Sequence, residues 1–402
     1  MSPDHPNAPR DVLDQTRRLL VELCEISSAS GDPIGARQVA ERLATELERH
    51  GLRTEITESP DGDGVVLPTL IARGPAAAER HLLVVGHLDT VLPAIPPRLD
   101  GDRLLATGAL DMKGGLAMLI GALDLLARRS RRAPDDLLVV VVPDEETSGV
   151  ISEHAVRRWS EHARAVLVIE PGERRGAGET LVAGRRGLAE WRLEITGTPS
   201  HSGLAFWQGR SALVAAADWA VRARALAAPG AGPTVNVARV IAGTADFVDN
   251  RQVGLELLGT SRQRNIVPER AVTEGEVRFL SPADRERMLG ALAGLAAAVA
   301  AEHGVAAEFT AGMSVPPVDP HGPGAPLVER VVELGRRAGL ALEVEADRGG
   351  ISFPNYLADP SRIAVVDGLG PVGDGMHTRD EWLDLGSLDR RVVLLADLLE
   401  TL

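Results

Sequence analysis

Three apolar runs in the first half of the chain show almost no alternation of polar and apolar positions. They cover residues 81–87 (HLLVVGH), 137–142 (LLVVVV) and 165–169 (AVLVI), and a small-residue segment with helical spacing, 114–129, lies between the first two. Strands that are apolar along their whole length and separated by helices are typical of a parallel sheet covered on both faces. The pattern therefore predicts an α/β fold with a mostly parallel sheet.

Helical patterns precede and follow these strands. Two helices are predicted at residues 11–28 and 35–50, and the second ends at Gly51, a residue type that commonly stops a helix. Near the other end of the chain, residues 327–339 and 389–402 again have helical spacing, with a strand-like run at 362–367 between them. These elements extend the same α/β arrangement to both ends of the chain.

A different pattern occupies the middle of the chain. Residues 187–196 (GLAEWRLEIT) alternate between polar and apolar, which is typical of a strand with one exposed face. The elements expected after it are a helix at 211–228, strands at 236–243 and 271–280, a helix at 281–304 and a strand at 306–311. This β-α-β-β-α-β order predicts a smaller α+β domain, residues 186–312, that interrupts a larger domain formed by 1–185 and 313–402.

Composition narrows the range of partners. The 402 residues carry a formal net charge of −14, and 44% are apolar but only 3% aromatic. The negative charge disfavours nucleic acid and anionic membranes as partners, because both require a basic surface. The first residues (MSPDHPNAPR) contain no basic segment followed by an apolar one, and no run approaches the roughly 20 apolar residues of a membrane span. We therefore expect a cytoplasmic protein.

Residues that bind metal ions or transfer protons gather where the apolar runs end. In a parallel sheet, ligands bind outside the carboxyl ends of the strands. The candidates at these ends, together with one acid from the loop before 114–129, are His87, Asp89, Asp111, Asp144, Glu145, Glu146 and Glu170. Each of them alone could be a helix cap, a solvated acid or a hydrogen-bonded histidine. Together, several acids at one sheet edge would repel one another unless a cation offset their charge.

The residue types also indicate which cation. Carboxylates mixed with imidazole suit Zn²⁺, with Mn²⁺ and Co²⁺ as alternatives, and the single cysteine, Cys24, leaves no thiolate cluster. Metal-assisted hydrolysis also needs a base that is not itself a ligand. The adjacent Glu145 and Glu146 can supply one ligand and one base, because neighbouring side chains at an irregular strand end point in different directions.

Six short motifs contain these residues in a fixed order. They are GHLDTVLP (86–93), ATGALDMKGG (106–115), PDEETSG (143–149), IEPGE (169–173), TPSHSG (198–203) and DGMHTRDEW (374–382). In this order and at these separations, the motifs resemble the aminoacylase and carboxypeptidase family of two-zinc peptidases. That family includes acetylornithine deacetylase, succinyl-diaminopimelate desuccinylase and glutamate carboxypeptidase. The resemblance extends from about Val12 to Leu402.

The resemblance implies a centre of two divalent metal ions, with Zn²⁺ expected first. Asp111 would bridge the two ions. His87 and Glu170 would complete one site, and Glu146 and His377 would complete the other.

Two further residues of the same motifs receive roles from the resemblance. Glu145 would be the general base that takes a proton from the attacking water and later delivers it to the leaving amine. Asp89 would hydrogen-bond the other ring nitrogen of His87 and fix its tautomer. Asp144 matches the motif, but only a structural role can be suggested for it.

The inserted domain resembles the lid and dimerisation domain of the family, which implies a homodimer. His201 in TPSHSG matches a histidine that stabilises the oxyanion, commonly in the active site of the partner subunit. Asn265 and Arg278 match positions that contact substrate. A guanidinium fork is suited to a substrate carboxylate, although an exposed strand arginine is otherwise usually just solvated.

Three departures from the family pattern concern the substrate. Met313 stands where the glutamate carboxypeptidase branch has an arginine, which removes the group expected to bind a side-chain carboxylate. Phe353, in GGISFPNY, stands where an aspartate is expected, and a more apolar pocket follows as a hypothesis. Residues 244–264 form an insertion that could be an extra hairpin, part of a dimer interface or a cover for the substrate cleft.

These observations predict a metal-dependent hydrolase that cleaves an amide bond next to a free carboxylate. The substrate would be an N-acyl amino acid, a dipeptide or a related small conjugate. One alternative is a two-metal aminopeptidase, against which the Arg278 match speaks. The other is a metal-binding auxiliary protein without turnover, against which Glu145 speaks, because a binding protein needs no base beside its ligands.

Overall fold

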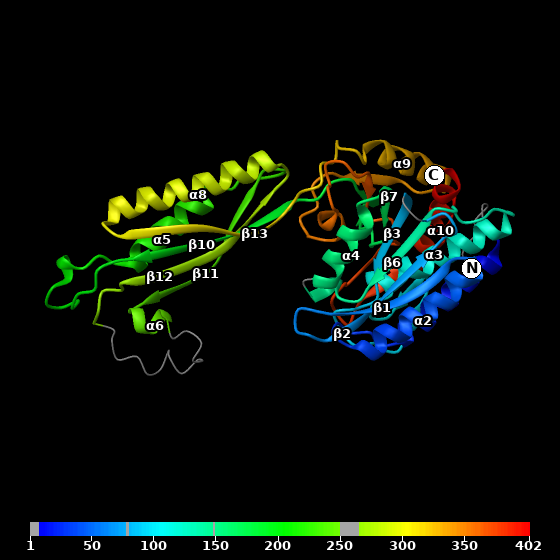
Figure 1. The fold of residues 1–402 in the computed structure, drawn as a ribbon, viewed down its shortest axis with the longest axis horizontal. Coiled ribbons are helices and arrows are strands. Elements are labelled where there is room, and N and C mark those ends of the chain that lie inside the picture. Colours follow the sequence, from blue (N-terminus) through cyan, green and yellow to red (C-terminus); the bar gives the residue numbers. More distant parts are fainter. Residues whose placement is uncertain (1–7, 78–79, 148, 250–264) are drawn as a thin grey trace. The chain divides into compact units, whose positions relative to one another are not determined.

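The computed structural model describes residues 8–77, 80–147, 149–249 and 265–402 and divides the chain into two compact units (Figure 1). The first unit comprises Met1–Arg185 and Val318–Leu402, and the second comprises Arg186–Pro317. The second unit extends beyond the predicted end at residue 312, because its last strand continues to Val315.

A six-stranded sheet forms the centre of the first unit, in the order β1-β2-β6-β3-β7-β15. Its strands are β1 (Arg53–Pro60), β2 (Val66–Arg73), β3 (His81–His87), β6 (Leu137–Val142), β7 (Ala163–Val168) and β15 (Val365–Val366). Strand β3 runs parallel to both of its neighbours, β6 and β7, and β15 runs parallel to β7. The hairpin of β1 and β2 is antiparallel and pairs with β6. The sheet is therefore mixed but mostly parallel, as the apolar runs predicted.

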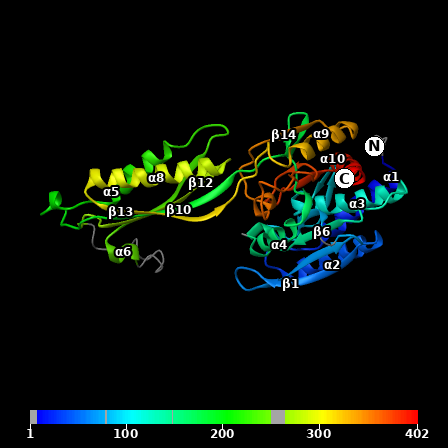
Figure 2. The same ribbon diagram turned by 45° about the horizontal axis from the view of Figure 1, so that its top comes forward.

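Helices pack around this sheet (Figures 1 and 2). They are α1 (Arg10–Glu25), α2 (Pro33–Arg49), α3 (Gly114–Arg128), α4 (Val150–Ser160), α9 (Ala325–Arg337) and α10 (Leu385–Thr401). Helix α2 starts at Pro33, two residues before the predicted start, because the Asp32 side chain accepts hydrogen bonds from the N–H groups of Ile34 and Gly35. It stops before Gly51, whose φ of 81° is left-handed. In the described part of the chain, no helix has both the length and the apolarity needed to cross a membrane.

Two small sheets complete the first unit. One has the order β14-β9-β8, and the other has the order β16-β17-β5-β4. Their strands are β8 (Arg174–Arg175), β9 (Gly178–Val182), β14 (Leu342–Glu345), β4 (Arg98–Asp100), β5 (Arg103–Leu105), β16 (Gly373–Asp374) and β17 (Trp382–Asp384). The second of these sheets is important for the site, because it joins the segment before Asp111 to the segment that contains His377.

The second unit is an antiparallel sheet with helices on one face. Its strands follow the order β11-β12-β10-β13. The elements are β10 (Gly187–Thr196), α5 (Ala212–Arg224), β11 (Thr234–Gly243), β12 (Arg270–Phe279), α8 (Pro282–His303) and β13 (Ala306–Val315), which is the predicted β-α-β-β-α-β order. Between sheet and helices, the rings of Trp191 and Trp219 pack edge to face at 4.9 Å.

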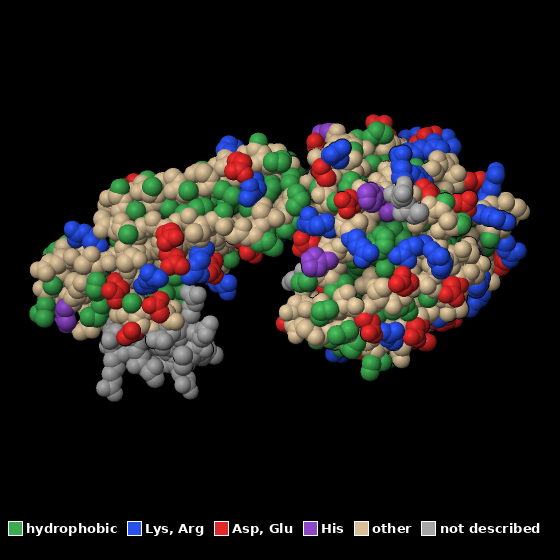
Figure 3. All heavy atoms as spheres, viewed as in Figure 1, with side chains coloured by type: hydrophobic (Ala, Val, Ile, Leu, Met, Phe, Trp, Pro, Cys, Tyr) green, Lys and Arg blue, Asp and Glu red, His purple; other side chains and the backbone are tan. Residues whose placement is uncertain are grey.

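The other face of this sheet is charged and polar. Arg192 and Arg239 both form ion pairs with Glu274 across neighbouring strands. Figure 3 shows acidic and basic side chains next to one another over β11 and β12. The alternation of residues 187–196, which form β10, predicted such a face, since every second residue points away from the helices.

The predicted insertion begins as a short helix, α6 (Ala245–Asp249). The rest of it, residues 250–264, lies outside the described residues, and the hairpin hypothesis for this segment therefore stays untested.

Candidate metal centre

The predicted metal ligands of the first unit meet at the carboxyl ends of three neighbouring strands. His87 is the last residue of β3. Glu145 and Glu146 follow β6 in a short 3-10 helix, Glu145–Thr147, and Glu170 follows β7. The three strands are parallel, so their carboxyl ends lie at the same edge of the sheet.

Asp111 lies between the two predicted histidine ligands. Its Oδ1 is 3.2 Å from Nε2 of His87, and its Oδ2 is 3.3 Å from Nε2 of His377. Nε2 of His87 is also 3.6 Å from Oε1 of Glu170, and Nε2 of His377 is 3.2 Å from Oε2 of Glu146. The five side chains therefore form two groups that share Asp111.

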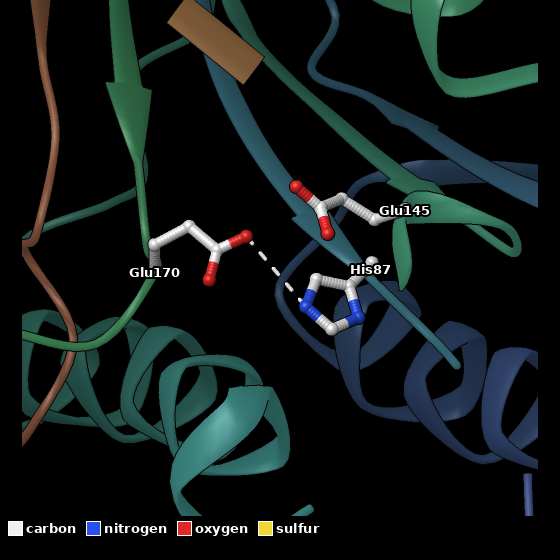
Figure 4. A group of neighbouring side chains, drawn as sticks. All are labelled: His87, Glu145 and Glu170. Atoms are coloured by element: carbon white, nitrogen blue, oxygen red, sulfur yellow. Dashed lines mark ion pairs between the residues drawn. The ribbon is translucent and has the colours of Figure 1, made fainter. Parts of the chain in front are cut away.

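Glu145 lies at the same centre. The ligand atoms of His87, Glu145 and Glu170 are within 4.8 Å of one another, and so are those of His87, Asp111 and Glu146. Figure 4 shows the carboxyl groups of Glu145 and Glu170 approaching the ring of His87 from the segments that follow two different strands. Geometry alone thus leaves Glu145 close enough to be a ligand or a base.

The electrostatics of the centre fit a bound cation. Among the described residues, the buried Oε1 atoms of Glu146 and Glu170 have no hydrogen-bond partner. Burial, together with the charge of Asp111, raises the pKa of Glu146 to about 8, and burial raises the pKa of Glu170 well above its ordinary value. Carboxylates in this situation are destabilised as anions unless a positive charge is nearby. Imidazole and carboxylate donors with open coordination are what a divalent cation such as Zn²⁺ binds.

Asp89 contacts the predicted ligand His87 mainly through its backbone carbonyl, and not mainly through its side chain as predicted. Nδ1 of His87 is 2.9 Å from the backbone oxygen of Asp89 and 3.4 Å from its Oδ1, so the carbonyl is the closer partner. The Asp89 carboxylate instead accepts hydrogen bonds from the backbone N–H groups of Glu145 and Glu146, each at 3.2 Å, and from the Ser30 hydroxyl at 2.8 Å. Asp89 therefore connects the end of β3 to both glutamates.

Asp144 has the structural role that the sequence left open. Its carboxylate accepts hydrogen bonds from Ile151 N at 2.8 Å, from Ser152 N at 2.9 Å and from the Ser152 hydroxyl at 2.6 Å. It thus satisfies N–H groups at the start of α4, which would otherwise have no partner within the helix. Asp144 therefore anchors the helix that follows the two glutamates.

The remaining predicted site residues belong to the second unit. His201 and Asn265 are neighbours, with His201 Nε2 3.0 Å from the Asn265 side-chain amide, and His201 pairs with Ile266 in an isolated β-bridge. Arg278 lies on β12, where its Nε and Nη2 contact the two carboxylate oxygens of Glu276 at 2.9 and 3.1 Å. A substrate carboxylate at Arg278 would therefore have to compete with Glu276.

The sequence suggested that Phe353 lines a more apolar pocket, but in the structure it does not line an open pocket. Its side chain is fully buried in the core of the first unit, and its ring centroid is 6.2 Å from that of His87. The apolar ring excludes water from one side of this ligand. Met313, the other departure, is exposed on β13 of the second unit.

Comparison with known proteins shows to which family the chain belongs. The model of peptidase family M20/M25/M40 matches residues 83–401. The chain belongs to this family. Carboxypeptidase G2 from Pseudomonas sp. (strain RS-16) is 28% identical to this M20 peptidase over 389 residues, which cover 95% of this chain and 88% of that protein. Succinyl-diaminopimelate desuccinylase from Methylibium petroleiphilum is 25% identical over 367 residues, which cover 86% of this chain and 88% of that protein.

Solved structures share the fold of this M20 peptidase. Aminopeptidase PepT from Bacillus cereus aligns with a TM-score of 0.77 and 20% identity over 96% of this chain and 98% of that one. A tripeptidase from Staphylococcus aureus aligns with a TM-score of 0.75 and 21% identity over 97% and 98%. The predictions of the family, of the fold class and of a metal-dependent hydrolase of amide bonds are confirmed.

Proposed function

We propose that this M20 peptidase is a dinuclear hydrolase that cleaves an amide bond next to a free carboxylate, in an N-acyl amino acid, a dipeptide or a related small conjugate. The observation that carries the proposal is the position of Asp111, with one carboxylate oxygen 3.2 Å from His87 and the other 3.3 Å from His377. The carboxypeptidase and desuccinylase names of the relatives support this class of substrate.

The two ions would share Asp111 as a bridging ligand. His87 and Glu170 would hold one ion, and Glu146 and His377 would hold the other. Zn²⁺ suits these donors best, with Co²⁺ and Mn²⁺ as alternatives. When bound, such ions polarise a scissile carbonyl and make an attacking water more acidic.

Glu145 would carry the protons. Burial raises its pKa, which favours a carboxylate that can hold a proton during the reaction. The Oε atoms of Glu145 are not needed as ligands, since five other side chains supply the ligand atoms for both ions. Glu145 would accept a proton from the attacking water and deliver it to the nitrogen of the leaving amine.

The second unit would recognise the substrate and form the subunit contact. Arg278 and Asn265 would bind the substrate carboxylate, and His201 would stabilise the oxyanion in its own or the partner subunit. A homodimer through this lid and dimerisation unit follows from the proposed family role, and the cytoplasmic location stays a prediction. Sedimentation velocity should give twice the 42.5 kDa mass of one chain, and a monomer at all concentrations would contradict the dimer.

The substitution Arg278→Ala should raise KM for carboxylate substrates while changing kcat little. A charge-assisted hydrogen bond is worth about 1.5–3 kcal/mol, so KM should rise about 10- to 150-fold. Arg192→Ala is the matched control, because Arg192 lies in the same sheet and pairs with Glu274. An unchanged KM in Arg278→Ala, or an equal rise in both variants, would remove Arg278 from the substrate site.

The experiment that tests the function is hydrolysis of a substrate panel with added Zn²⁺, Co²⁺ or Mn²⁺. The panel pairs N-acetyl amino acids and dipeptides with the same compounds as C-terminal carboxamides, and adds amino-acid anilides as aminopeptidase substrates. Release of amine from the free acids, and much less from the carboxamides, is expected. Cleavage of the anilides alone would favour the aminopeptidase, and no cleavage with metal bound would favour an auxiliary protein.

A further inference from the structure

Glu381 is a buried carboxylate whose hydrogen bonds all go to the loop of Asp111. Its Oε2 accepts a hydrogen bond from Gly108 N at 2.8 Å. Its Oε1 accepts hydrogen bonds from Leu110 N at 2.8 Å and from Asp111 N at 3.0 Å. The residue is only 3% exposed, so water does not compete for these donors.

Backbone hydrogen bonds also join the segment of Glu381 to the segment that precedes Asp111. The carbonyl of Glu381 accepts a hydrogen bond from Ala106 N at 3.2 Å. Strand β17, which begins at Trp382, pairs with β5 through Trp382 and Leu105, and it pairs with β16 on its other side. The loop between β16 and β17 contains His377. The segment with His377 and the segment that leads to Asp111 are therefore one structural piece.

This piece carries two of the proposed metal ligands, Asp111 and His377. His377 has a left-handed backbone, with φ of 64°, which is uncommon for a residue other than glycine and has to be maintained by its surroundings. The Asp111 backbone is held by the carboxylate of Glu381, which lies four residues after His377. Ligands whose backbone is fixed by such hydrogen bonds lose less freedom when they bind an ion.

We propose that Glu381 is a positioning residue that holds Asp111 and His377 at the separation needed for the ion they share with Glu146. The proposal rests on the dinuclear centre of the proposed function. The ion at His87 and Glu170 depends on Glu381 less, because these two ligands are mounted on β3 and after β7 rather than on the loop that Glu381 braces. Replacing Glu381 should therefore lower the affinity of the ion at Glu146 and His377 more than that of the ion at His87 and Glu170.

The variant Glu381→Gln tests this role with little change of shape. An amide has one acceptor oxygen, so its NH₂ group must face at least one of the three N–H donors that Glu381 now satisfies. We expect the affinity of the ion at Glu146 and His377 to fall about 10- to 100-fold, as is typical when a partner that orients ligands is removed. Metal competition with a chelator gives both affinities, and the visible spectrum of the Co²⁺-loaded protein reports the ligand geometry without any turnover.

Glu179→Gln is the matched control. Glu179 is also buried and also accepts three hydrogen bonds, from Ser387, Arg390 and Arg391, but it touches no predicted metal ligand. This variant should lower the melting temperature and leave both metal affinities and the Co²⁺ spectrum unchanged. If Glu381→Gln behaves in the same way, Glu381 is a structural residue only and the proposal is wrong.

A second variant and the metal content of the wild type distinguish failure of this proposal from failure to fold and from failure of the dinuclear centre. If Glu381→Gln does not fold, Glu381→Asp keeps the charge but retracts the carboxylate, and it should weaken the same ion; equal affinities in wild type and Glu381→Asp would overturn the proposal. If the wild-type protein binds fewer than two ions per chain, the dinuclear centre fails, whatever Glu381 does.

Discussion

Glu145→Gln should reduce kcat by about 10²- to 10⁴-fold, the usual contribution of a general base, and leave the metal content unchanged. The amide keeps the size of the side chain but cannot accept a proton from the attacking water. The backbone of Glu145 is held by Asp89, so the neighbouring ligands should not move. Metal content is measured by elemental analysis and kcat on whichever free acid of the panel the wild type hydrolyses fastest.

The adjacent Glu146→Gln provides the comparison. Glu146 is proposed as a ligand, since its Oε2 is 3.2 Å from His377 Nε2. This variant should lose metal as well as activity. Near wild-type turnover in Glu145→Gln would exclude Glu145 as the base, and loss of metal in Glu145→Gln would make it a ligand instead.

Asp111→Asn should reduce the affinity of both metal ions and abolish turnover. Asp111 has one carboxylate oxygen 3.2 Å from Nε2 of His87 and the other 3.3 Å from Nε2 of His377. An amide offers one neutral acceptor oxygen in place of two anionic ones, so it cannot bridge two cations effectively. We expect fewer than one ion per chain at metal concentrations that saturate the wild type, as measured by elemental analysis after gel filtration.

Asp124→Asn is the control for this prediction. Asp124 lies on α3, the helix that follows the Asp111 loop, and pairs with Arg49 and His50. It should keep the metal content and the activity of the wild type. Retention of two tightly bound ions in Asp111→Asn would show that Asp111 is not the bridge.

The sequence was sufficient to predict that the candidate metal ligands after the apolar strands lie at one edge of the sheet. Unbroken apolar runs predicted parallel strands, and the carboxyl ends of such strands meet at one edge, which is where His87, Glu146 and Glu170 lie. The position of His377 came only from the resemblance to a family, because it lies on a loop about 200 residues from Glu170 with no periodic pattern around it.

Residues that act through backbone N–H groups were harder to predict. Asp144, Asp89 and Glu381 each hold a loop or a helix start, and which N–H groups they reach depends on turns that leave no pattern in the sequence. Glu381 is part of the motif DGMHTRDEW, and its distance of four residues from His377 was the available signal. Its partners, however, come from a segment about 270 residues earlier in the chain.

One contact could have been predicted from the sequence but was not. Glu276 and Arg278 are two residues apart on a strand and therefore lie on the same face of the sheet. Their ion pair follows directly from the alternation of β12. The position of Phe353 could not be predicted in this way. Its apolar character was clear from the sequence, but its place in the core, and not at a pocket, depends on the tertiary packing.

Anomalous X-ray diffraction at the zinc edge, on crystals grown with Zn²⁺, tests the central claim most directly. The account predicts two peaks on either side of the Asp111 carboxylate, one coordinated by His87 and Glu170 and the other by Glu146 and His377, with no bond from Glu145 to either ion. A single peak, or an ion coordinated by Glu145, would contradict the dinuclear centre with a free glutamate base.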